Sequence, residues 1–221
     1  SYLNEGDVVS VTVTMSEATV VTGSPRIALT IGSDTKYATY SSGSSSTSLV
    51  FTYTIESSLT DADGISIGAN ALALNSGTLK DASGNNATLT HNAVSANSSY
   101  MVDTSAPTAV FSAATDNVGS VTGALTSGDT TDDTSLVLSG TNESGSTVKV
   151  YNGTTELGDA TVSGTSWSYT ATVANGTTYA FNVKETDSAG NTSAATTSFA
   201  VTGDTSAPTA VFSAATDNVG S

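Results

Sequence analysis

The 221-residue chain contains no cysteine, one histidine, one tryptophan and only five basic residues. The lack of cysteine excludes disulfides, thiolate metal sites and a cysteine nucleophile. Twenty acidic residues give a formal net charge of −15. This charge excludes nucleic acid as a natural partner, since a phosphate backbone requires a basic surface, and it argues against adsorption to anionic lipid. No apolar run approaches the ~18 residues of a membrane-spanning helix, so membrane insertion is not expected.

The sequence motifs of common catalytic classes are also missing. The single histidine, His91, lies in a Thr/Asn-rich segment and has no second histidine to complete an HExxH zinc site. We expect it at the surface. Neither GxSxG, GxxxxGK nor GxGxxG occurs. The carboxylates lie in turn motifs rather than on opposed core strands, which disfavours a glycosidase-type acid/base pair. The sequence therefore predicts a protein that is not an enzyme.

The most regular feature present is an 18-residue phrase, DTSAPTAVFSAATDNVGS, that occurs twice without a change. It occupies residues 103–120 and again 204–221, an offset of 101 residues. Repetition at this period predicts tandem modules of the size of a small β-sandwich domain. We expect modules at 1–102 and 103–203, with 204–221 as the first strand of a further repeat. Pro107 stiffens the connector and favours an extended end-to-end arrangement.

Apolar residues alternate with Ser and Thr through most of both modules. Clear examples are Val9, Val11, Val13 and Met15 in the first module and Trp167, Tyr169 and Ala171 in the second. A period of two predicts half-buried strands with one face on a core. Asn-Gly, Asp-Gly and Gly-Asn turns separate these strands, and residues 41–47 read as a hairpin loop. The predicted fold class is all-β, with two tandem sandwich modules. Only residues 69–74 suggest a helical turn.

Acidic residues concentrate in the turns, and two interpretations stay open. Asp and Asn cap turns through their own hydrogen bonds, and solvated carboxylates keep a protein soluble. Calcium is the alternative, because it binds carboxylate and amide oxygens in loops and offsets repulsion that few basic residues can neutralise. We predict calcium as the cofactor. The candidate ligands are Glu5, Asp7, Asp61, Asp63, Asp81, Asn85, Asp103, Asp132, Asp133, Glu143, Asp187, Asn191 and Asp204.

Several longer motifs carry a family resemblance. The second module contains TDDTS at 131–135, WSY at 167–169 and DSAGN at 187–191. With these motifs it resembles the bacterial Ig-like repeats of giant RTX-type surface adhesins. The first module contains EGDVVSVTVTMSEA at 5–18 and DASGNNA at 81–87, and it is similar to a sister class of Ig-like repeat in the same proteins. The resemblance covers essentially the whole chain.

The resemblance implies a function and a location. Such adhesins leave Gram-negative bacteria by type I secretion, and their Ig-like repeats act as extenders on the cell surface, stiffened by calcium near module junctions. The implied partners are neighbouring repeats of the same chain, in a monomer. The implied calcium ligands are Asp103, Asp204, Asp187, Asn191, Asp132 and Asp133. Tyr179 would form a tyrosine corner.

A second function stays open, namely a calcium-dependent module that binds carbohydrate or another cell surface. Such a module would be expected to present an exposed aromatic platform. The single tryptophan, Trp167, falls instead on the inward phase of its strand. Ice binding through Thr-x-Thr pairs such as Thr12–Thr14 is disfavoured, because these pairs are short and do not recur at a fixed interval. The sequence therefore favours the extender.

Overall fold

The computed structural model describes residues 2–120 and 122–216. These residues form strands, and their only helical element is one 3-10 turn, η1 (Ser98–Tyr100). The prediction of an all-β fold is confirmed. No helix in the described residues is long and apolar enough to cross a membrane. The chain divides into two compact units, Ser1–Pro107 with Thr186–Ser193, and Thr108–Glu185 with Ala194–Ser221.

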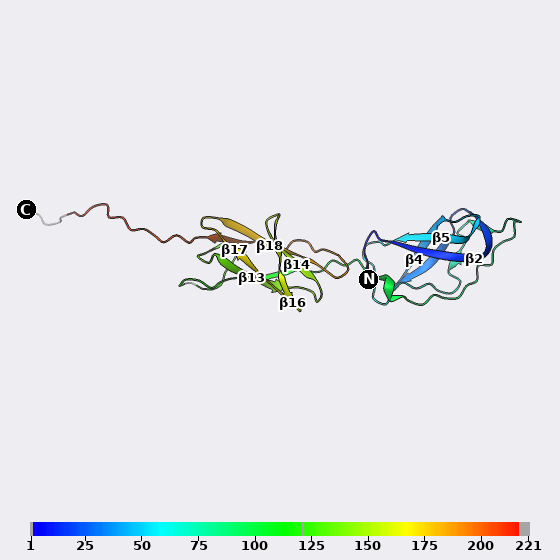
Figure 1. Ribbon diagram of the computed structural model, residues 1–221, viewed down its shortest axis with the longest axis horizontal. Helices are drawn as coiled ribbons and strands as arrows, with labels where there is room; N and C mark the ends of the chain where they lie inside the picture. The colour runs from blue at the N-terminus through cyan, green and yellow to red at the C-terminus, as the bar shows by residue number, and fades with distance from the viewer. Residues whose placement is uncertain (1, 121, 217–221) are drawn as a thin grey trace, which may run out of the picture. The chain divides into compact units, whose positions relative to one another are not determined.

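The first unit is built from two sheets (Figure 1). Its strands are β1 (Tyr2–Leu3), β2 (Val8–Thr22), β3 (Arg26–Ile31), β4 (Asp34–Ser42), β5 (Ser46–Thr54), β6 (Thr60–Asp61), β7 (Leu72–Ala73), β8 (Thr78–Lys80) and β9 (Met101–Asp103). Six of them pair in the order β7-β3-β4-β5-β2-β8, and three in the order β1-β9-β6. Leu29 and Phe51 of the larger sheet and Val102 of the smaller one belong to a single buried core. The predicted hairpin at 41–47 joins β4 to β5.

Strand β2 pairs with a different neighbour in each half. Residues Val8–Thr14 and Thr19 pair with β5, and residues Val20–Thr22 pair with β8. The register with β5 shifts after Thr14, as expected where a strand bends from one pairing to another. Val9 is buried, but Val11, Val13 and Met15 are only half-buried. The apolar side chains in the middle of β2 are therefore only partly covered by the core.

The helical turn suggested for residues 69–74 is wrong. Leu72 and Ala73 form β7, which pairs antiparallel with Ile27 and Arg26 of β3. Leu72 is buried in the core of the first unit. The pairing with β3 and the burial of Leu72 therefore override the weak local preference for a helix.

The second unit is a sandwich of two five-stranded sheets (Figure 1). Its strands are β10 (Val110–Asp116), β11 (Gly123–Ala124), β12 (Asp129–Thr131), β13 (Ser135–Thr141), β14 (Thr147–Asn152), β15 (Thr155–Asp159), β16 (Thr161–Ser163), β17 (Ser166–Thr172), β18 (Thr178–Thr186) and β19 (Phe199–Gly203). The strand orders are β11-β10-β13-β17-β16 and β12-β19-β18-β14-β15. Leu138 and Trp167 from the first sheet meet Val150 and Phe181 from the second in one core.

Trp167 anchors this core, as its inward phase predicted. Its ring lies edge-on to Phe111, with the centroids 5.7 Å apart, and Phe111 stacks on Phe199 at 5.2 Å. The indole Nε1 donates a hydrogen bond to the carbonyl oxygen of Val110 at 3.0 Å. Aromatic contacts of this kind add to the stabilisation from burial alone. They join β10, β17 and β19 across both sheets.

Tyr179 forms the predicted tyrosine corner. Its hydroxyl oxygen accepts a hydrogen bond from the main-chain N–H of Ala174, five residues earlier, at 3.0 Å. Its ring stacks on Phe181 with centroids 5.3 Å apart. The side chain thereby fixes the turn between β17 and β18.

Replacing Tyr179 with Phe removes this acceptor but keeps the ring. We expect the free energy of unfolding of the second unit to fall by about 1 kcal/mol, because the N–H of Ala174 loses its partner. Urea unfolding followed by Trp167 fluorescence measures the change. Tyr169→Phe is the matched control, because it also removes one exposed hydroxyl hydrogen bond, to the Leu157 carbonyl, but one that does not close a turn. An equal loss in both variants would contradict a special role for Tyr179.

The terminal copy of the repeated phrase does not adopt the conformation of the first copy. Residues 204–216 contain no strand, so the expected strand is wrong for the described part of 204–221. Hydrogen bonds hold only its start: the N–H of Asp204 donates to the Thr131 carbonyl, and the N–H of Thr205 to Asn175 Oδ1, both at 2.8 Å. Phe212 is 99% exposed. The segment lacks the neighbouring strand that β13 provides to β10.

Candidate metal-binding loops

The DxxGN turns of both modules have the same internal hydrogen bonds. In the first, the carboxylate of Asp81 accepts from the main-chain N–H of Asn85 at 2.8 Å and from its side-chain Nδ2 at 2.7 Å. These bonds, the side-chain one first, lower the pKa of Asp81 below its ordinary value. Gly84 has φ +91°, a left-handed conformation that favours glycine. The turn thus presents an ionised carboxylate at the surface.

The turn at residues 187–191 belongs to the first compact unit. Asp187 Oδ1 accepts from the N–H groups of Ala189 and Asn191, both at 2.9 Å, and Asp187 Oδ2 accepts from Asn191 Nδ2 at 2.9 Å. The same Nδ2 donates to the main-chain oxygen of Asp103 at 2.9 Å. The structure therefore brings Asp187, Asn191 and the main chain of Asp103 together within this unit.

Asp61 organises a turn from a buried position. Its Oδ1 accepts from the N–H groups of Gly64 at 2.7 Å and Asp63 at 3.3 Å, and its Oδ2 accepts from the N–H of Gly32 at 2.8 Å. A side chain on Gly64 would collide with the carbonyl of Asn97, 1.9 Å from the ideal Cβ position. Backbone donors on both oxygens satisfy a buried carboxylate. Asp63, by contrast, is exposed.

The second unit buries two carboxylates close to one threonine. Thr131 Oγ1 donates to Asp116 Oδ2 at 2.7 Å and accepts from the N–H of Asp133 at 3.1 Å. The carboxylate of Asp133 accepts from the N–H of Ser135 at 2.7 Å and of Asn117 at 3.3 Å. All three side chains of this Asp116–Thr131–Asp133 cluster are buried. No ion pair is formed by either carboxylate among the described residues.

Asp132 lies beside this cluster and is exposed. Its Oδ2 is 2.3 Å from the ideal Cβ position on Gly119, and Gly119 has φ +74°, a left-handed conformation that favours glycine. Asp132 and Asp133 were predicted from the sequence, but Asp116 was missed. The signal was present: Asp116 and Asn117 are acid and amide side chains inside the repeated phrase.

Glu185 was also missed, and it is fully buried. Its Oε1 accepts from the N–H of Glu143 at 2.5 Å and from Ser146 Oγ at 2.6 Å. The predicted ligand Glu143 contributes its main chain here, while its side chain is exposed. Glu185 follows Phe181 and Val183 on the inward phase of β18. Acidic residues are rare at inward-facing strand positions, and this was the signal that could have identified Glu185.

The remaining candidates lie apart. Asp7 Oδ2 accepts from the N–H of Asn4 at 2.8 Å, and Asp204 Oδ1 accepts from the N–H of Ser206 at 3.2 Å. Glu5 is exposed. Within residues 2–120 and 122–216, no three His, Asp or Glu side chains converge on one position suited to a metal ion. The candidates thus form small separate groups, and any cation would need main-chain or amide oxygens as further ligands.

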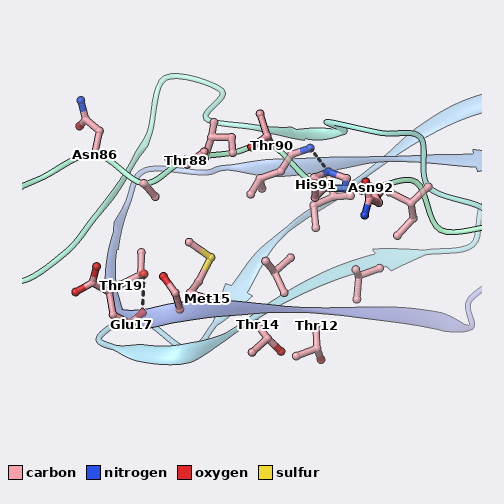
Figure 2. A pocket seen from close by; sticks show the side chains of 18 of the residues that line it. Thr12, Thr14, Met15, Glu17, Thr19, Asn86, Thr88, Thr90, His91 and Asn92 are labelled. Carbon is pink, nitrogen blue, oxygen red and sulfur yellow. Dashed lines mark hydrogen bonds between the residues drawn. The ribbon is translucent and has the colours of Figure 1, made fainter.

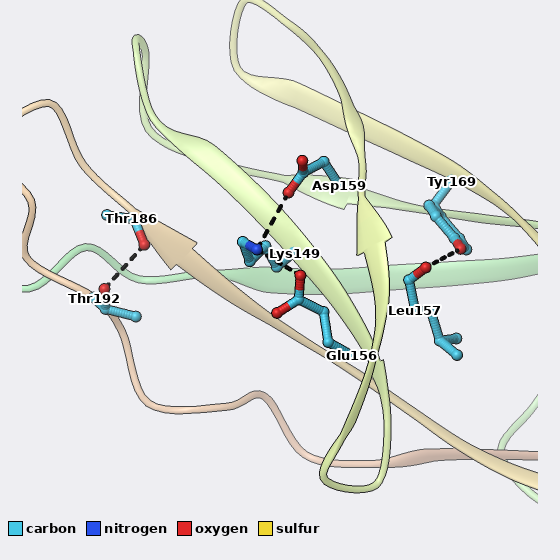
Figure 3. A network of polar contacts seen from close by, with 7 residues as sticks. All are labelled: Lys149, Glu156, Leu157, Asp159, Tyr169, Thr186 and Thr192. Atoms are coloured by element: carbon cyan, nitrogen blue, oxygen red, sulfur yellow. Dashed lines mark hydrogen bonds and ion pairs between the residues drawn. The ribbon is translucent and has the colours of Figure 1, made fainter.

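Basic residues do not neutralise the predicted ligands. The three ion pairs of the described residues join Lys36 to Glu56, and Lys149 to Glu156 and Asp159. Figure 3 shows Lys149 between its two partners, near the bond from the Tyr169 hydroxyl to Leu157, together with the bonded Thr186 and Thr192 hydroxyls. None of these paired acids is a predicted ligand. Exposed pairs of this kind add little stability.

His91 is less exposed than predicted. Its ring is half-buried, with Nε2 accepting from the N–H of Leu72 at 3.3 Å and Nδ1 bonded to the Asn92 carbonyl at 2.8 Å. These contacts give the ring a structural role beside β7. They also occupy both nitrogens, so His91 has no free nitrogen in this arrangement for a metal ion.

Residues 108–205 match the family model described as "Bacterial Ig-like domain". The second module is thus similar to bacterial Ig-like domains. Among solved structures, the fibronectin(III)-like modules of CbhA from Clostridium thermocellum are similar at 12% identity and a TM-score of 0.39, over 92% of this chain and 88% of that chain. The Bacteroides ovatus mixed-linkage glucan utilization locus protein SGBP-B, in complex with a mixed-linkage heptasaccharide, has 14% identity and a TM-score of 0.26, over 92% of this chain and 42% of that chain. No curated protein matches the chain.

Proposed function

We propose that this chain is part of the extender region of a large bacterial surface adhesin. Its Ig-like modules would carry distal adhesive domains away from the cell, outside the bacterium and after type I secretion. The supporting observation is the unchanged 18-residue phrase, repeated 101 residues apart around a β-sandwich that matches bacterial Ig-like domains. Repeats of fixed period and conserved joint sequence suit a spacer, whose length grows with module number. The role is structural and requires no catalytic group.

We further propose that calcium stiffens this spacer. Twenty acidic residues are present against five basic ones. The hydrogen-bonded carboxylates among the predicted ligands accept from main-chain and amide N–H groups, and none of the described ion pairs involves a predicted ligand. A divalent cation would remove their mutual repulsion and fix the loops that carry them. The two best-supported places are the turn at 187–191 with the main chain of Asp103, and the Asp116–Thr131–Asp133 cluster. Both combine carboxylates with nearby carbonyl or hydroxyl oxygens.

Calorimetric titration of the chain with calcium tests this proposal. We expect heat of binding and a rise in melting temperature that EDTA reverses. At a free calcium concentration one hundred times Kd, linkage gives a stabilisation of about 2.7 kcal/mol per site. Magnesium is the control, because it demands a tighter octahedral geometry and gives up its water reluctantly. The absence of both heat and a melting shift would reject the calcium sites while leaving the spacer role to be judged separately.

A binding module for carbohydrate or another cell surface is the second candidate. One observation favours it: Tyr37 on β4 is 43% exposed, and the Arg26 guanidinium lies 3.9 Å from its ring centroid. Exposed aromatic rings are common in surfaces that recognise ligands. A single ring is a small platform, so this function ranks second. Specific binding on a glycan array, lost in Tyr37→Ala, would favour it over the spacer.

A further inference from the structure

A groove of about 510 Å³ lies within the first unit, between the middle of β2 and the segment at residues 85–92 (Figure 2). Met15 points into it from β2, while Thr12 and Thr14 point the other way. Val11 and Val13 share the phase of Met15 and also line the groove. These three apolar side chains are only half-buried. The groove therefore has an apolar wall that no residue of the described chain fully covers.

The same part of β2 is an open sheet edge. On one side, Val8–Thr14 pair with β5; on the other, β8 pairs only with Val20–Thr22. Within residues 2–120 and 122–216, no other strand pairs with β2. In an antiparallel edge strand, alternate N–H and C=O groups point outward without a strand partner. Such a row is a template for a further strand.

This edge also lacks the usual protection. Residues Val8–Ser16 read VVSVTVTMS, without a charge, proline or glycine. Natural edge strands are commonly protected by lysine, proline or a bulge. Here the register shift comes only after Thr14.

The opposite wall is the segment at residues 85–92, which main-chain hydrogen bonds hold in place. The N–H of Ala87 donates to the Leu79 carbonyl at 2.9 Å, and the His91 carbonyl accepts from the N–H of Asn70 at 3.2 Å. These bonds tie the segment to the 70–79 region rather than to β2. Within the described residues, no strand lies between β2 and this segment.

We propose that this groove is a site for β-strand addition, in which an extended segment of another protein pairs with β2 between Val11 and Ser16. Its alternate side chains would be apolar and would pack on Val11, Val13 and Met15. Main-chain hydrogen bonds supply affinity in this mode, and the alternate side chains supply specificity. Glu17 and Asp81 line one end of the groove. With the net charge of −15, they favour a basic residue at that end of the segment.

A defined peptide tests the site in the full 221-residue chain. The probe is an eight-residue peptide with alternating valine and threonine between terminal lysines, labelled for fluorescence polarisation. We expect saturable binding, and amide exchange at residues 11–16 slowed at least tenfold. A second peptide, N-methylated at every other residue, cannot donate the ladder hydrogen bonds and should bind at least tenfold more weakly. This peptide comparison needs no protein variant.

Paired variants locate the site. Val11→Lys places a charge in the groove and should weaken binding at least tenfold. Val8→Lys is the control, because Val8 lies on the same strand, is 59% exposed and does not line the groove. Thermal unfolding verifies that both variants fold.

Three results would overturn the proposal. The first is no binding of the peptide at millimolar concentration. The second is equal binding of the N-methylated peptide, which would indicate an apolar ligand site without strand pairing. The third is concentration-dependent dimerisation of the chain that protects residues 11–16 without peptide, which would make a second copy the occupant. The proposal does not depend on the spacer role. Asp81 lines the groove and is also a predicted calcium ligand, so the peptide titrations are run in EDTA.

Discussion

Replacing Gly140 with Ala is expected to destabilise the second unit by about 3 kcal/mol or more, at the upper end of the cost of overpacking a core. Gly140 lies on β13, between Phe111 of β10 and Trp167 of β17. An ideal Cβ at this position would lie 1.9 Å from the Val110 carbonyl oxygen and 2.6 Å from Trp167 Nε1. Both atoms belong to the hydrogen bond that anchors the indole. A methyl group would therefore push β13 away from its neighbours β10 and β17. It would also break the hydrogen bond between Trp167 and Val110.

Urea unfolding followed by Trp167 fluorescence measures the effect of Gly140→Ala. Gly68→Ala is the control, because no atom lies within 4 Å of its ideal Cβ and its φ is not in the left-handed region. Gly68 lies in the first unit and the single tryptophan in the second, so calorimetry of thermal unfolding measures the control. The control should stay within about 1 kcal/mol of the parent, as expected for a compatible Gly→Ala substitution. A Gly140→Ala protein with the stability of the parent would show that β13 does not approach Val110 and Trp167 so closely.

Asp133→Asn is expected to give the second large loss of stability. The loss has two parts, one from hydrogen bonding and one from calcium binding. Asp133 is 1% exposed, and its two oxygens accept from separate main-chain N–H groups, of Ser135 and Asn117. An amide places a donor against one of these donors, so we expect a loss of about 1–3 kcal/mol even in EDTA. If Asp133 is a calcium ligand, the variant should also lose the calcium-dependent part of the stability.

Unfolding of the Asp133→Asn protein in calcium and in EDTA separates the two parts. Asp129→Asn is the matched control: Asp129 is exposed, accepts from the N–H and hydroxyl of Thr126, and is not a predicted ligand. It should keep the calcium response of the parent. A full calcium response in Asp133→Asn would remove Asp133 from the ligand set while leaving its hydrogen-bonding role intact.

Much of the fold follows from local patterns. Ile27, Leu29 and Ile31 alternate with polar or small residues, and all three are buried. The DxxGN turns close through the Asp–Asn hydrogen bonds that such residues form locally. A period of two and a self-capping turn both depend on neighbouring residues, so the sequence displays them directly. The same reasoning found the inward phase of Trp167, whereas the corner at Tyr179 was implied by the family resemblance.

The buried acids were harder to predict because their partners are distant in sequence. Asp116 is held by Thr131, 15 residues away, and Glu185 by Ser146, 39 residues away. Neither partner can be identified before the strand order is known. Likewise, β7 depends on pairing with β3 rather than on its own two residues. Composition indicated an excess of loop acids but could not say which of them the fold would bury.

The repeated phrase shows the limit of local sequence most directly. In the first copy, Phe111 packs on Trp167 and Phe199 within a strand. In the second, the equivalent residue, Phe212, is 99% exposed and lies outside any strand. Identical residues thus adopt two conformations, because pairing with β13 and packing on the core stabilise only one of them. Strand formation here is a tertiary effect.

Small-angle X-ray scattering of the chain in calcium and in EDTA, at constant ionic strength, tests the calcium-stiffened spacer most directly. A stiff spacer predicts a larger average radius of gyration and a longer maximum dimension in calcium, together with a higher melting temperature. Constant ionic strength keeps the screening of the 20 acidic residues equal in both samples. Superimposable scattering profiles and identical melting curves in the two conditions would contradict the account.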